Sequence, residues 1–246
     1  MIRIMSIMLC MITFFCEAKE LHVLLLADTL TDMKVSSFKD LKHMKKAMKT
    51  IAGATRMPLH ITKIYGKELT KERVTTWIRQ APIHNDDVFV VYYTGHGLRT
   101  KKTTTIWPSP YFAYNDEIIA IQDLITTITS KPATFHLILI DCCNNYIEDE
   151  ITKSFGRPPY KSKGKRHKEN YKKLFSDPRG VIIASGAIPG KKAWCTEKGS
   201  IFTSALLDCI EKEISASQPQ WPHILAKTKA LCEDLQEPQY ELFLEN

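Results

Sequence analysis

Five short runs of largely apolar residues recur along the chain, each with the length of a buried β-strand. The first, LHVLLLAD, is continuously apolar, which is typical of a strand buried on both faces of a sheet. The second alternates apolar and polar residues, and the third is rich in β-branched and aromatic residues, which favour strands. The pattern predicts strands at residues 21–28, 59–65, 88–95, 135–140 and 180–186.

Segments with helical periodicity lie between and after these runs. Their apolar side chains recur every three or four residues, and the capping residues Ser36, Ser37 and Thr70 precede two of them. Residues 103–114, rich in threonine, proline and aromatic residues, predict an excursion or hairpin. Strands that alternate with helices predict one α/β domain, with a mainly parallel central sheet and helices on both faces. We expect the helices near residues 36–52, 71–80, 117–129, 201–214 and 219–235.

The first 18 residues have the pattern of a secretory signal peptide. Arg3 precedes a mostly apolar stretch over residues 4–16, and a site of small residues ends at Ala18. The stretch is too short for a membrane-spanning helix, which needs about 20 residues. We therefore expect an exported chain, periplasmic or secreted, whose folded domain covers residues 19–246. A buried N-terminal strand or an uncleaved anchor is the alternative.

Composition and charge narrow the class of protein. The chain has 246 residues, 44% hydrophobic and 25% charged, which is enough apolar material for a core of its own. The net charge of +7 is concentrated in KSKGKRHKENYKK, residues 161–173, which holds seven basic residues and one acidic residue. Such a run without apolar periodicity predicts a solvated basic loop at about 155–178. A single basic segment is not a nucleic-acid-binding face, so we expect no nucleic-acid partner.

The cysteines and histidines give no metal-binding spacing. Removal of the signal peptide leaves five of the seven cysteines, an odd number, so at least one stays unpaired. No CxxC pair is present, and GHGLRT lacks the third glycine of a dinucleotide loop. We therefore expect no structural metal and no cofactor. Seven histidines are assigned to structural or surface roles: His22, His43, His60, His84, His136, His167 and His223.

Two of the predicted strands end in reactive side chains. Residues 88–95 lead into His96, and residues 135–140 lead into Asp141, Cys142 and Cys143. Because the carboxyl ends of parallel strands meet at one edge of the sheet, both groups should emerge at that edge. A thiol beside an imidazole is the arrangement for nucleophilic catalysis on a carbonyl group.

These motifs resemble the caspase and metacaspase family of cysteine peptidases and its wider clan, which includes the legumains. The resemblance is carried by YYTGHG (92–97), LILIDCC (137–143) and IASGAIPGKKAWCTEKGSIFTSALL (183–207). It implies that Cys143 is the nucleophile and His96 the general acid and base, with the backbone N–H groups of Gly97 and Cys143 as the oxyanion hole. Cys142 is the rival nucleophile, but strand alternation should point it to the opposite face.

The resemblance to metacaspases also implies a substrate preference. Asp141, two residues before the nucleophile, would line the S1 pocket, and Asp40 is the best match for a second acid there. Two carboxylates in a pocket select lysine or arginine at P1. Cys195 stands where a caspase would carry an arginine that accepts aspartate. A peptidase with this preference could also cut its own basic loop.

Two other functions remain open at this point. The chain could be a binding protein that keeps the fold while Cys143 and His96 are idle, or a legumain-like transpeptidase that passes the acyl group to an amine. The partner expected in each case is a peptide or protein. The sequence sets neither the oligomeric state nor a calcium requirement.

Overall fold

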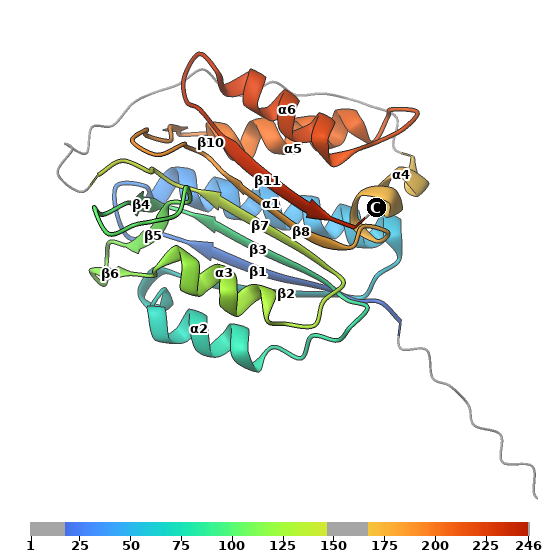
Figure 1. The fold of residues 1–246 in the computed structure, drawn as a ribbon, viewed down its shortest axis with the longest axis horizontal. Coiled ribbons are helices and arrows are strands. Elements are labelled where there is room, and N and C mark those ends of the chain that lie inside the picture. The colour runs from blue at the N-terminus through green and yellow to red at the C-terminus, as the bar shows by residue number, and fades with distance from the viewer. Residues whose placement is uncertain (1–17, 147–166, 246) are drawn as a thin grey trace, which may run out of the picture.

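The computed structural model describes residues 18–146 and 167–245, which form a central sheet with helices on both faces (Figure 1). The sheet has the strand order β11-β8-β7-β3-β1-β2. The five predicted strands are confirmed and run parallel to one another. They are β1 (Leu21–Ala27), β2 (Leu59–Tyr65), β3 (Val88–Thr94), β7 (Phe135–Asp141) and β8 (Gly180–Ser185).

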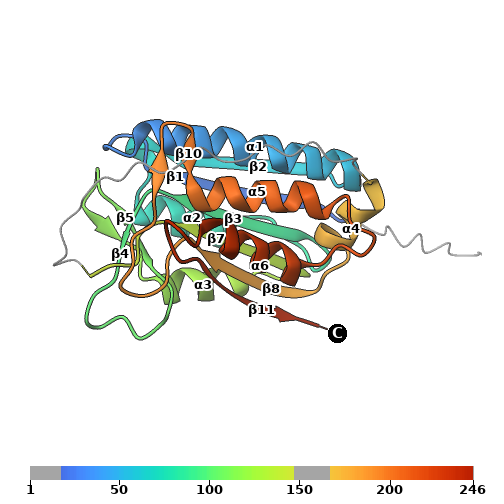
Figure 2. The same cartoon turned by 90° about the horizontal axis from the view of Figure 1, so that it is seen from above.

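The helices divide into two groups, one on each face of the sheet. Figure 2 shows α1 (Lys34–Thr55), α5 (Ile201–Glu213) and α6 (Trp221–Cys232) side by side over one face. The other face carries α2 (Lys71–Gln80) and α3 (Ile121–Thr129). Alternate residues of β1 enter the two cores, which explains why the run is continuously apolar.

The residues around His96 form a small second sheet. It consists of β4 (His96–Leu98), β5 (Ser109–Phe112) and β6 (Glu117–Ile118), and it accounts for the predicted excursion. A two-stranded hairpin, β9 (Cys195–Thr196) and β10 (Gly199–Ser200), leads into α5, and a short 3-10 helix, η1 (Gly66–Glu68), follows β2. Both small sheets lie near the carboxyl ends of the parallel strands (Figure 1).

Three local predictions differ from the structure. The basic loop expected at 155–178 includes a helix, α4 (Lys168–Phe175), because Tyr171, Leu174 and Phe175 supply a buried apolar face within the basic run. A sixth strand, β11 (Gln239–Leu244), pairs antiparallel with β8 at the sheet edge and was not predicted. The first helix begins at Lys34, before its expected caps, whereas Thr70 caps α2 by accepting a hydrogen bond from Arg73 N at 3.1 Å.

Two sequence predictions fall wholly or partly outside the described residues. These are the signal peptide, at residues 1–18, and the part of the basic loop before His167. Among the residues that the structure describes, no helix combines the length and the apolar character needed to cross a bilayer.

Candidate active site

Strands β3 and β7 end together and their chains continue side by side beyond the sheet. Thr94 and Asp141 are register partners, and Gly95 N donates to the Asp141 carbonyl oxygen at 3.3 Å. Further along, Arg99 and Tyr146 form a parallel bridge. The difference in residue number between the two partners is the same at both pairings, so the two segments keep one parallel register.

This constant offset places His96 opposite Cys143. Close packing confirms how near the two segments lie: a β-carbon at Gly97 would overlap Cys142 Sγ and would lie 2.7 Å from the Cys143 carbonyl oxygen. Only glycine fits there, because any other residue would force the segments apart. The structure thus brings the His-Gly and Cys-Cys segments together at the carboxyl edge of the sheet.

The two adjacent thiols have different environments. Cys142 is 2% exposed and packs in the core beneath α2 and α3, as strand alternation predicts. Cys143 is half-buried, with Sγ 3.4 Å from Ala193 N and 3.5 Å from the Ala193 carbonyl oxygen. Burial raises the pKa of the Cys143 thiol, while the hydrogen bond from the Ala193 N–H opposes that rise. Cys143 is therefore the more accessible sulfur, and it rests as a thiol.

His96 is held by an acid that the sequence analysis did not single out. Its Nε2 lies 2.8 Å from Asp32 Oδ1, and the imidazole side chain is only 15% exposed. Asp32 lies in the turn between β1 and α1. The His96 carbonyl oxygen accepts a hydrogen bond of 2.6 Å from the buried Tyr93 hydroxyl, which fixes the backbone at this position.

Asp40 projects from α1 and is fully buried beside the end of β3. Its carboxylate accepts hydrogen bonds from Ser200 N at 2.9 Å, Ser200 Oγ at 2.6 Å and Thr94 Oγ1 at 3.0 Å. Burial raises the pKa of Asp40 to about 6, although these hydrogen bonds favour the charged form.

Asp141 is the second buried acid and lies near Asp40. It accepts hydrogen bonds from Thr203 N at 3.0 Å and Thr203 Oγ1 at 2.5 Å. Burial and the nearby charge of Asp40 raise the pKa of Asp141 to about 7. Within residues 18–146 and 167–245, no lysine or arginine lies within ion-pair distance of either carboxylate. The pair therefore lacks a cationic partner, and it becomes negatively charged as the pH rises through these pKa values.

Comparison with known proteins identifies the family. The family model described as Caspase domain matches residues 25–243, nearly the whole chain. The chain belongs to the caspase domain family. The fold of this caspase domain is similar to that of a Geobacter sulfurreducens protein of known crystal structure, with a TM-score of 0.58 and 14% sequence identity over 92% of this chain and 94% of that one. No curated protein sequence matches.

Membership of the caspase family indicates a cysteine peptidase that acts on proteins. In this caspase domain the structure gathers the five residues that the sequence analysis proposed for the site at one edge of the sheet: Asp40, His96, Gly97, Asp141 and Cys143. In the part of the chain that is described, Cys143 Sγ bonds to Ala193 and not to His96.

The caspase domain also contains site residues that sequence reasoning missed. Asp32 contacts His96, and Ser200 and Thr203 hold the two buried acids. A lone aspartate in a loop carries no local signal of its partner. The Gly-Ser at the start of α5 was noted as part of the family pattern, but its contact with Asp40 spans 160 positions of sequence.

Proposed function

We propose that this chain is a cysteine endopeptidase in which Cys143 and His96 hydrolyse peptide bonds after lysine or arginine. The observation that carries the proposal is the alignment of the His96 and Cys143 segments at one sheet edge, beside two buried carboxylates. The family supports the peptidase activity, and the acid pair supports the basic P1 residue.

The proposed reaction uses groups of this chain at each step. His96 removes the proton from the Cys143 thiol, and the thiolate attacks the scissile carbonyl carbon. The N–H groups of Gly97 and Cys143 donate to the oxyanion that forms. The C–N bond then breaks as His96 returns the proton to the leaving amine. Water, deprotonated by His96, hydrolyses the thioester and restores the thiol.

Asp32 is the proposed positioning residue for His96. Its carboxylate accepts the Nε2–H, so Nδ1 is the nitrogen left to exchange a proton with Cys143. The negative charge also stabilises the imidazolium that forms when the thiol is deprotonated. Asp32 acts through His96 and is not itself a catalytic residue.

We expect Asp32→Asn to lower kcat by roughly 10- to 100-fold, because the imidazolium loses its charged partner while the ring can still be hydrogen-bonded. The loss should fall on kcat while KM stays near the wild-type value, and Asp32→Glu should restore part of the activity. Asp116→Asn, which removes another exposed acid bonded to Tyr111, is the matched control. An equal loss in Asp32→Asn and Asp32→Glu, or a loss in KM alone, would contradict the positioning role.

A panel of fluorogenic peptides that differ only at P1 tests the proposed function. We expect the wild type to cleave after arginine and lysine and not after aspartate, and Cys143→Ala to cleave none of them. Turnover after aspartate would overturn the proposed specificity. Absence of both turnover and covalent capture by an arginyl acyloxymethylketone would identify an idle binding protein. Acyl transfer to an added amine in place of water would identify a transpeptidase.

Two further parts of the proposal concern maturation. We propose that the chain is exported after removal of residues 1–18, as the pattern of the signal peptide indicates. We also propose that the enzyme cuts its own basic loop. Because peptidases bind extended chains and Lys172 and Lys173 lie in α4, the proposed cuts fall before Lys168.

A further inference from the structure

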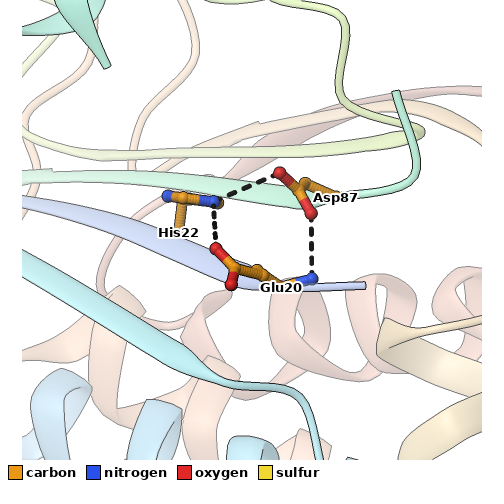
Figure 3. A group of neighbouring side chains, drawn as sticks. All are labelled: Glu20, His22 and Asp87. Atoms are coloured by element: carbon orange, nitrogen blue, oxygen red, sulfur yellow. Dashed lines mark hydrogen bonds and ion pairs between the residues drawn. The ribbon is translucent and has the colours of Figure 1, made fainter. Parts of the chain in front are cut away.

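Four polar side chains gather at the amino ends of β1, β2 and β3, the edge of the sheet opposite the candidate active site. Glu20 immediately precedes β1 and His22 lies at its start, and His22 is the register partner of His60 on β2. Asp87 immediately precedes β3 and accepts the Glu20 N–H at 2.9 Å. Figure 3 shows the side chains of Glu20, His22 and Asp87 pointing toward one another.

The separations between their polar atoms are those of ligands around one metal ion. His22 Nε2 lies 3.2 Å from Asp87 Oδ2 and 3.4 Å from Glu20 Oε2, and His60 Nε2 lies 3.0 Å from the same Glu20 oxygen. An ion held tetrahedrally at about 2.0–2.2 Å keeps its ligand atoms about 3.3–3.6 Å apart. The ligand atoms of Glu20, His22 and Asp87 all lie within 4.8 Å of one another, so these three side chains are close to the spacing of a tetrahedral site without rearrangement of the backbone. His60 contacts the Glu20 carboxylate from outside this group.

The environment of the His22 side chain independently indicates a bound ion. His22 is 3% exposed, yet its Nε2 makes no hydrogen bond of acceptable geometry, because it points between two carboxylates (Figure 3). The His22 ring stacks on His60, with centroids 4.9 Å apart, which holds the two histidines together.

The carboxylates are fixed and lack a cationic partner. Asp87 is held by two backbone N–H groups, from Glu20 to Oδ1 and from His84 to Oδ2 at 2.7 Å. In the described residues, neither Glu20 nor Asp87 has a lysine or arginine within ion-pair distance. Two carboxylates and the buried His22 imidazole therefore give a site whose charge a divalent cation balances.

We propose that Glu20, His22 and Asp87 bind a divalent transition-metal ion, with Zn²⁺ the best match to one imidazole and two carboxylates. His60 holds the Glu20 carboxylate from outside the site. The ion joins the amino ends of β1 and β3 at the edge remote from Cys143, so its role is structural. It fastens the segment that precedes β1 to the rest of the sheet. The proposal is independent of the peptidase activity.

Titration of the metal-free full chain with Co²⁺ and Zn²⁺ tests this site. We expect one Co²⁺ to give the intense visible bands of tetrahedral coordination without a thiolate-to-cobalt charge-transfer band. Zn²⁺ at about 100 times its Kd should raise the thermal midpoint by about 5–10 °C. A thiolate band that disappears in Cys143→Ala would instead place the metal on the nucleophile and overturn the proposal.

Two variants separate metal binding from folding. His60→Ala removes the imidazole that holds the Glu20 carboxylate. Because the His60 side chain is 55% exposed, the fold should persist while affinity falls by about tenfold or more. His22→Gln should lose binding more completely. The control is His223→Ala, because His223 also pairs with a glutamate, Glu213 at 3.1 Å, but without a second histidine. Equal Zn²⁺ affinity in the wild type, His60→Ala and His223→Ala, or no binding by the wild type, would overturn the site.

Discussion

Replacing Cys143 with alanine lowers kcat/KM by a factor of about 10⁴ or more, because the variant lacks the atom that attacks the carbonyl. Cys142→Ala keeps most of the activity. The buried sulfur of Cys142 packs against Gly97, and its loss leaves only a small cavity of modest cost. Steady-state kinetics with an arginyl peptide measure both effects.

The same pair of variants decides which thiol reacts. If Cys142→Ala were inactive and Cys143→Ala active, the assignment of the nucleophile would be reversed. Cys209→Ala, which removes a buried thiol on α5, controls for the general loss of a core sulfur.

Self-cleavage is tested with the same Cys143→Ala variant. On a denaturing gel, wild type that cuts its basic loop runs as two fragments, whereas Cys143→Ala runs as one. Equal cleavage of both would assign the cut to another protease.

Asp141→Asn lowers kcat/KM for arginyl and lysyl substrates by a factor of about 10² or more, since removal of one partner of a buried charge pair costs about 2–5 kcal/mol. The asparagine keeps an oxygen to accept from Thr203, so the fold should be retained. Substrates with a neutral P1 residue should change little. Asp208→Asn, another buried acid on α5, is the matched control. An equal loss for neutral and basic P1 residues would show that Asp141 supports the catalytic residues and not the pocket.

The raised pKa values of Asp40 and Asp141 also determine the direction in which substrate binding and stability change with pH. Deprotonation of Asp40 near pH 6 and of Asp141 near pH 7 makes the proposed S1 site negative, so KM for an arginyl peptide should fall as pH rises through this window. Both folded pKa values exceed the value of about 4 for an unfolded aspartate, so the folded chain binds more protons. Their contribution to stability is therefore lost between about pH 4 and 7, and Asp141→Asn should be the more stable protein at pH 8 by thermal denaturation.

The sequence predicts the features that depend on local pattern. Largely apolar or alternating runs place five strands correctly, and their ends bring His96 and Cys143 to one edge because parallel strands share a direction. Helix α4 escaped prediction because the basic residues around Tyr171 obscure its apolar face. Strand β11 was not predicted because its residues are half-exposed and because it becomes a strand only by pairing with β8.

The contacts that complete each site depend on register between distant segments. Asp32 and His96 are 64 positions apart in the sequence, and no local spacing predicts their contact. His22 and His60 carry no metal-binding spacing, and they become neighbours only because β1 and β2 pair in one particular register. No short motif encodes either contact, because each joins segments that are distant in sequence and meet only in the folded chain.

The described chain enters β1 near Glu20 and leaves β11 at Leu244, and both points lie at the amino edge of the parallel strands. Either end can therefore carry an affinity tag or a surface tether without obstructing substrate access to Cys143. A molecule immobilised in this way presents its catalytic edge to solution. A polyhistidine tag at the N-terminal end, by contrast, would lie close to His22 and compete for the proposed ion, so metal titrations call for protein without that tag.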